Sequence, residues 1–169
     1  MKSKADRVTV DLSGYQDLVV ILLGMKVNAF TGLKTLFGFG PKINDSVKGA
    51  PDDLLGHEYF LFSMFPPHLG MRQYWRDFES LEIWARSDPH RVWWKRFLRN
   101  SGGTGFWHEA YFKAGGMEAV YVDVFKDIGF RQFAPVQPAR GRMFSARARA
   151  QKAGEPKSVA AVNEEEFYS

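Results

Sequence analysis

The stretch LVVILLGMKV, residues 18–27, restricts the fold of this chain more than any other stretch. Its apolar and β-branched residues would lie on both faces of an extended segment, which is typical of a strand buried in the centre of a sheet. A strand of this kind needs neighbouring strands and covering layers. The rest of the chain must therefore supply a sheet and helices around it.

Two regions carry apolar residues at helical spacing. In residues 29–48, the GFGP insert should break the helix into two pieces, with Pro41 opening the second. A later helix begins at Asp77, whose carboxylate can cap its N-terminus, and it is interrupted by SDPH. Asp88 can cap a further helix that has the following proline at its first position.

Strand patterns complete a regular order. The strands expected after residues 18–27 are 57–65, 71–76, 106–112 and 117–124, the last two joined by a tight hairpin at Gly115 and Gly116. This order predicts an α+β fold, a ferredoxin-like βαββαβ unit with one added strand. Its helices would cover one sheet face and leave the other bare and apolar. Pairing two such sheets across a two-fold axis would give a dimeric α+β barrel, so we expect a homodimer.

The two ends of the chain differ from this pattern. We expect one domain over residues 1–133, in which the first dozen residues are loose, followed by a mostly disordered basic tail over residues 134–169. The net charge is +4, but no nucleic-acid motif accompanies the tail. We interpret the tail as a solubilising segment and expect no nucleic-acid partner.

Composition excludes several classes of protein. The chain has no cysteine, which excludes disulfides, thiolate metal sites and cysteine nucleophiles. The apolar run from Leu18 to Met25 is far too short to cross a bilayer, which takes about 20 residues. Asp11 and Asp17 precede it, which argues against a secretory segment. We therefore expect a cytoplasmic protein without a membrane partner.

The strand GFWHEAYF carries the first candidate for chemistry. Alternation places His108 on one face with Phe106 and Ala110, and places Glu109 on the other face with Trp107. On an inner strand, His108 would be a partly desolvated imidazole suited to act as a base or a ligand. Glu109 could orient the local network or pair with a basic residue. The alternative is a core histidine with satisfied hydrogen bonds.

His90 is the second candidate. It would lie in the first turn of a helix, where the positive end of the helix disfavours an imidazolium and leaves a neutral ring able to bind a metal. The alternative is an exposed polar residue at a helix start.

Aromatic residues make up 15% of the chain, so its core is either solid or lines a pocket for a small apolar molecule. The candidate substrate-binding residues are Trp107, Tyr74 and Trp84. Packing in the core or at a dimer interface is the alternative role for these three residues.

Three strings resemble a known family. They are QYWRDFESLEIWARSDPHRVWWKRF, GFWHEAYF and MEAVYVDV, preceded by the opening strand LVVILLGMKVN. Together they resemble the fungal fumagillin-pathway monooxygenase-like family over most of residues 17–130. That resemblance implies a dimeric α+β barrel.

A more distant resemblance is to the haem-containing aldoxime dehydratases, which carry a similar helix followed by an HE strand. It implies haem as a cofactor, with His90 as the axial ligand of the iron and His108 as the distal acid/base. The chain has about half the length of those enzymes, and Asp123 stands where they usually have asparagine.

Three functions follow as hypotheses. The first is a monooxygenase-like oxidoreductase that acts on a small apolar or aromatic compound, with His108 as acid/base and no cofactor. The second is a haem-dependent lyase with His90 on the iron. The third is a non-catalytic module that binds a hydrophobic ligand or serves in a stress response.

Overall fold

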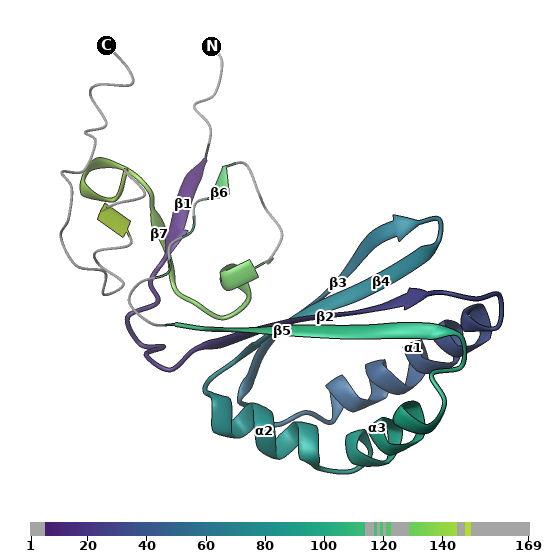
Figure 1. Ribbon diagram of the computed structural model, residues 1–169. Coiled ribbons are helices and arrows are strands. Elements are labelled where there is room, and N and C mark those ends of the chain that lie inside the picture. The colour runs from purple at the N-terminus through teal and green to yellow at the C-terminus, as the bar shows by residue number, and fades with distance from the viewer. Residues whose placement is uncertain are drawn as a thin grey trace. The chain divides into compact units, whose positions relative to one another are not determined.

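The computed structural model describes residues 6–113, 117, 119, 121–122, 129–144 and 148–149. The chain divides into two compact units, one formed by Asp17–Phe112 and the other by the described parts of 1–16 and 113–169. Figure 1 shows all three α-helices in the first of these units. None of the helices in the described part of the chain is long and apolar enough to cross a membrane.

The first unit contains a four-stranded antiparallel sheet. Its strands are β2 (Val19–Val27), β3 (Leu54–Met64), β4 (Pro67–Trp75) and β5 (Thr104–Phe112), in the order β3-β4-β2-β5. β2 pairs with both β4 and β5, so the prediction of a central strand at residues 18–27 is confirmed. The helix α1 (Gly32–Lys48) connects β2 to β3, and α2 (Phe78–Arg86) and α3 (His90–Arg99) connect β4 to β5. The predicted βαββαβ unit of an α+β fold is therefore present.

The three helices lie on the same side of the sheet (Figure 1). We call this side the helix face and the other side the opposite face. On the helix face, Val19 and Trp75 pack against Leu81 of α2 in a buried cluster. Alternation along β2 places Leu23 on the same face as Val19, together with its partners Met71 and His108 on the neighbouring strands. The register thus fixes which side chains of the sheet face the helices.

The helix starts agree only in part with the sequence pattern. Asp77 caps α2 as predicted, because its Oδ1 accepts a hydrogen bond from the backbone N–H of Ser80 at 2.8 Å. Asp88 was expected to cap α3 but makes no such bond. Its carboxylate instead accepts from Arg91 Nε at 3.2 Å, and Pro89 occupies the N-cap position.

The expected break in the first helix is wrong. α1 is one helix of 17 residues with Pro41 inside it. A proline removes one helical hydrogen bond and crowds the preceding turn. Here Pro41, Gly38 and Gly40 are exposed, so water can satisfy the carbonyl that loses its partner. Phe39 and Ile43, in the same stretch, line a cavity above the sheet.

The second unit differs from two predictions, that the first dozen residues are loose and that residues 117–124 add a strand to the main sheet. β1 (Arg7–Val10) is a strand within the first dozen residues, which we expected to be loose. It pairs with β6 (Tyr121–Val122) and β7 (Val136–Pro138) in a separate sheet, so β6 is not an added strand of the four-stranded sheet. Val10 is buried against Leu12 and Ala134. The apolar partners of β1 thus come from distant parts of the chain, which a local pattern does not show.

Short 3-10 helices at Gly129–Gln132 and Gly141–Met143 complete the second unit. β7 and the second of these helices lie in the segment expected to be mostly disordered. Residues 150–169 and the hairpin expected at Gly115 and Gly116 lie outside the described residues.

Candidate functional site

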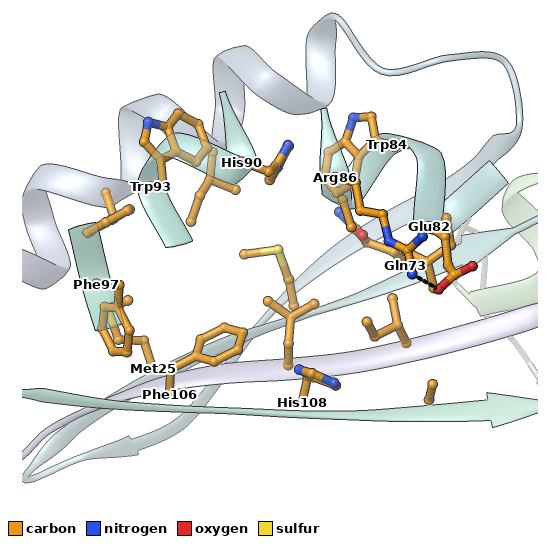
Figure 2. A pocket seen from close by; sticks show the side chains of 18 of the residues that line it. Met25, Gln73, Glu82, Trp84, Arg86, His90, Trp93, Phe97, Phe106 and His108 are labelled. Carbon is orange, nitrogen blue, oxygen red and sulfur yellow. Dashed lines mark hydrogen bonds and ion pairs between the residues drawn. The ribbon is translucent and has the colours of Figure 1, made fainter. Parts of the chain in front are cut away.

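A cavity of about 440 Å³ lies between the helix face of the sheet and the three helices. Ile21, Leu23 and Met25 of β2 form part of its floor, and Trp84 of α2 and Trp93 of α3 line it from the helices. Figure 2 shows Trp93, Phe97 and Phe106 toward one end and Trp84 with Arg86 toward the other. Its size and largely apolar lining are those of a site for a small organic molecule.

Besides the indole N–H groups of Trp84 and Trp93, five side chains bring polar groups to this cavity. They are Gln73, Glu82, Arg86, His90 and His108. Arg86 Nη2 donates to Glu82 Oε1 at 2.6 Å, one turn apart on α2. This exposed pair balances its own charge, and two imidazoles, one carboxamide and two indole N–H groups also line the cavity.

His108 lines the cavity from β5 and is exposed in the chain. The sequence pattern predicts that His108 lies on an inner strand with a partly desolvated ring. β5 is instead an edge strand, because β2 is its only neighbour in the sheet within the part of the chain that the structure describes. The imidazole can therefore be reached both from the cavity and from water, and the expected desolvation is not observed (Figure 2).

His90 lies in the first turn of α3, as predicted, in a very different setting. Its ring lies between two indoles, with centroid distances of 3.8 Å to Trp84 and 5.2 Å to Trp93. Its Nε2 is 3.2 Å from Ser46 Oγ. Burial lowers the pKa of His90 below 6.5, so the ring is neutral at physiological pH. The direction of this shift agrees with the expected neutral imidazole, and its cause is desolvation by burial, not the helix terminus.

The geometry of His90 does not fit an axial ligand to haem iron in the cavity. One ring nitrogen, Nε2, faces Ser46, and the other, Nδ1, is buried without a hydrogen-bond partner among the described residues. Coordination would require the ring to turn from between Trp84 and Trp93 and to lose the bond to Ser46.

The candidate residues lie on different faces of the sheet. Trp84 lines the cavity with His90 and His108, whereas Trp107, Glu109 and Tyr74 are not among its lining residues. Those three lie on the opposite face, as the strand register requires. The structure thus brings three of the six candidates together.

On the opposite face the remaining candidates have partners of their own. Trp107 Nε1 donates to His68 Nε2 at 2.8 Å. The hydroxyl of Tyr74 donates to Glu58 Oε2 at 3.2 Å, and Glu109 accepts a hydrogen bond from the hydroxyl of Tyr111.

Gln73 is a cavity residue that the analysis of the sequence missed. It is 1% exposed and shares the helix face of β4 with Met71 and Trp75. The sequence MRQYW does indicate this position, because strand alternation places the glutamine on the same face as Met71 and Trp75. A polar side chain on the covered face of a strand needs a partner, either in the protein or in a ligand.

Comparison with known proteins assigns the family. Residues 18–130 match the family described as monooxygenase af470-like. The chain belongs to this family. A search of curated protein sequences finds no match to the chain.

Two solved structures of aldoxime dehydratases share this fold, and a third structure shows a weaker similarity. The aldoxime dehydratase OxdRE in complex with butyraldoxime is 18% identical, with a TM-score of 0.65 over 88% of this chain and 43% of that one. A second aldoxime dehydratase structure is 17% identical, with a TM-score of 0.63 over 87% and 43%. The cofactor-independent oxygenase SnoaB from Streptomyces nogalater is 9% identical, with a TM-score of 0.42 over 56% of this chain and 91% of that one. The chain spans less than half the length of the aldoxime dehydratases.

The lowered pKa of His90 predicts how stability changes with pH. In the folded state this group binds a proton less readily than in the unfolded state, so acid favours unfolding. The free energy of unfolding should fall as the pH drops below 6.5, the ordinary value, and level off below the folded pKa. His90→Phe, which keeps an aromatic ring between the indoles, should reduce this fall in urea titrations from pH 7.5 to 4.5.

The reduction will be partial, because burial also lowers the pKa of His57 and gives a loss of stability in the same direction. The double variant His57→Phe, His90→Phe should therefore show a smaller dependence than either single variant. An identical pH dependence in wild type and His90→Phe would contradict the assignment of a buried neutral imidazole.

Proposed function

We propose that this protein is a monooxygenase-type oxidoreductase that acts on a small apolar or aromatic compound bound in the cavity, with His108 as the acid/base. The observation that carries the proposal is an accessible imidazole at the border of an apolar cavity of about 440 Å³. Membership of a monooxygenase family supports oxidation as the overall reaction.

His108 has the access that a base requires. An imidazole can take a proton from an acidic C–H or O–H group of a bound molecule and donate a proton later in the reaction. Removing that proton makes the molecule electron-rich, which is the condition for it to reduce O₂ itself. The apolar floor formed by Ile21 and Leu23 would hold the ring system of the substrate next to His108.

The other predicted residues have different roles in this proposal. Trp84 shapes the end of the cavity and packs its ring against that of His90. Glu109, Trp107 and Tyr74 lie on the opposite face, so we assign them no contact with the substrate. Glu109 is exposed and bonded to Tyr111, and it does not serve as the partner of His108 in the proposed site.

We also propose that the opposite face pairs with the same face of a second copy, giving a homodimer. Phe62 and Tyr111 support this pairing, since they lie on that face with 45% and 48% of their surfaces exposed. Apolar side chains of this size on a sheet face are stabilised when a partner removes them from water.

Exchange of hydrogen for deuterium tests the role of His108 directly. The ketone 2-tetralone is a flat apolar compound with an acidic C–H group, and its exchange in D₂O can be followed by NMR without any oxidation. We expect wild-type protein to accelerate the exchange and His108→Ala to lose about 10²–10⁴-fold of that acceleration, because a positioned base contributes about this much. Binding, measured by quenching of tryptophan fluorescence, should change little.

His68→Gln is the matched control, since His68 lies on the opposite face and should not affect exchange. Equal rates for wild type and His108→Ala would show that His108 is not the base. Tight binding with no exchange and no oxygen consumption would instead favour a non-catalytic ligand-binding module.

The haem-dependent lyase is tested by adding haemin to the purified protein. Because Nε2 of His90 contacts Ser46 and Nδ1 is buried, we expect no Soret band that depends on this residue. Spectra of wild type and His90→Ala should therefore match. A histidine-type Soret band present in wild type and lost in His90→Ala would restore the haem alternative.

The proposed dimer is tested by sedimentation equilibrium. Wild type should have twice the chain mass of 19.3 kDa. Phe62→Lys should shift the protein toward the single chain, because a charge in an apolar interface costs its desolvation. A wild-type protein that sediments as a single chain at micromolar concentration would rule out the pairing.

A further inference from the structure

The carboxamide of Gln73 has a fixed orientation in the floor of the cavity. Its side chain is 1% exposed and lines the cavity from the inner strand β4. Trp75 Nε1 donates to Gln73 Oε1 at 3.1 Å. An indole nitrogen can only donate, so this bond decides which end of the carboxamide is the oxygen. The opposite end is therefore an NH₂ group with two hydrogens to place.

Only one of these hydrogens is accounted for. Gln73 Nε2 is 3.3 Å from Nδ1 of His57. Burial lowers the pKa of His57, which keeps its ring neutral and lets Nδ1 accept the bond. The second N–H of Gln73 has no partner among the described residues. A buried donor of this kind is costly unless something accepts its hydrogen, and a bound ligand would do so.

Other donors line the cavity, on Trp84, Arg86, Trp93 and His108, but they belong to side chains that are more exposed than Gln73. Glu82 and Arg86 bond to each other, and Nε2 of His90 faces Ser46. Strand register places Gln73 and His108 on the same floor, separated by β2. Two strand spacings of about 4.8 Å and a two-residue offset of about 6.8 Å put their Cα atoms roughly 12 Å apart. Side chains reaching inward from both positions can contact one small ring compound at the same time.

We propose that Gln73 donates a hydrogen bond to an oxygen atom of the ligand, so that the cavity selects apolar ring compounds that carry a carbonyl or phenolic oxygen. This inference rests on the proposed function and gives its substrate class. When His108 removes a proton from a carbon next to a carbonyl, the C–H bond breaks and the proton moves to the imidazole. The electron pair forms a C=C bond, and the carbonyl oxygen becomes an enolate. The Gln73 N–H then stabilises the charge on that oxygen, as a preorganised donor does.

A pair of matched ligands tests this selectivity. Tetralin and 2-tetralone share one ring skeleton and differ in a carbonyl oxygen. From quenching of tryptophan fluorescence, we expect wild type to bind the ketone about tenfold more tightly than the hydrocarbon. Gln73→Leu should lose that preference through weaker ketone binding, with tetralin affinity nearly unchanged as the control for an intact cavity. Equal affinities in wild type, or an unchanged preference in Gln73→Leu, would overturn the inference.

A second measurement needs no variant. The infrared C=O stretch of ¹³C-labelled 2-tetralone bound to wild type should lie below its frequency in an apolar solvent, because a hydrogen bond weakens the C=O bond. An unshifted band would overturn the inference even if Gln73→Leu failed to fold. In Trp75→Phe, which frees the carboxamide to turn, the shift should decrease.

His108→Ala separates this inference from the proposed function. It should lose deuterium exchange but retain the preference for the ketone, because recognition of the oxygen belongs to Gln73. Unchanged exchange in His108→Ala together with a ketone preference in wild type would contradict only the role of His108. Absence of the preference with exchange still dependent on His108 would contradict only the role of Gln73. If neither compound binds, both proposals are wrong.

Discussion

Burial of Trp75 between the sheet and α2 is the interaction on which the site depends. The indole is fully buried against Val19 and Leu81, and its ring lies 5.0 Å from that of Trp84. Replacing a buried tryptophan by alanine costs about 3–5 kcal/mol in a typical core. Here the same side chain also donates to Gln73, so one residue both attaches α2 to the sheet and orients the carboxamide in the cavity floor. Packing and recognition cannot be separated at this position.

The two imidazoles of the cavity show how environment divides their roles. His90 packs between two indoles and is kept neutral by burial, with Nε2 near Ser46 and Nδ1 buried. His108 lies on an edge strand with its ring accessible. Of the two histidines, His90 therefore serves in packing, and His108 is a candidate base. Access, and not the presence of histidine in the sequence, distinguishes them.

Much of the first unit could be predicted because its signals are local. The period of the apolar residues defined the strands and helices, and the cap at Asp77 followed from one carboxylate at a helix start. Alternation also predicted that His108 and Glu109 face opposite sides of the sheet. What alternation cannot tell is the order of the strands, which depends on pairing between distant segments. The edge position of β5, and with it the exposure of His108, was therefore missed.

Other differences have the same origin. β1 is a strand because residues beyond position 120 supply its pairing partners. α1 continues through Pro41 because that turn is exposed to water, which the letters GFGP do not reveal. Gln73 could have been found, since it interrupts an apolar face of β4, but its significance depends on Trp75 and His57 as neighbours. Sequence patterns thus define elements well and tertiary environments poorly.

The edge position of β5 has a consequence for any hydrogen that passes through His108. A ring in contact with water trades its proton with the solvent far faster than a typical enzyme completes a turnover. A proton taken from a substrate would be diluted into the bulk before it could be handed back. Any hydrogen that the imidazole delivers to a product would therefore come from water. A deuterium label at that position of the starting compound would not be carried into the product.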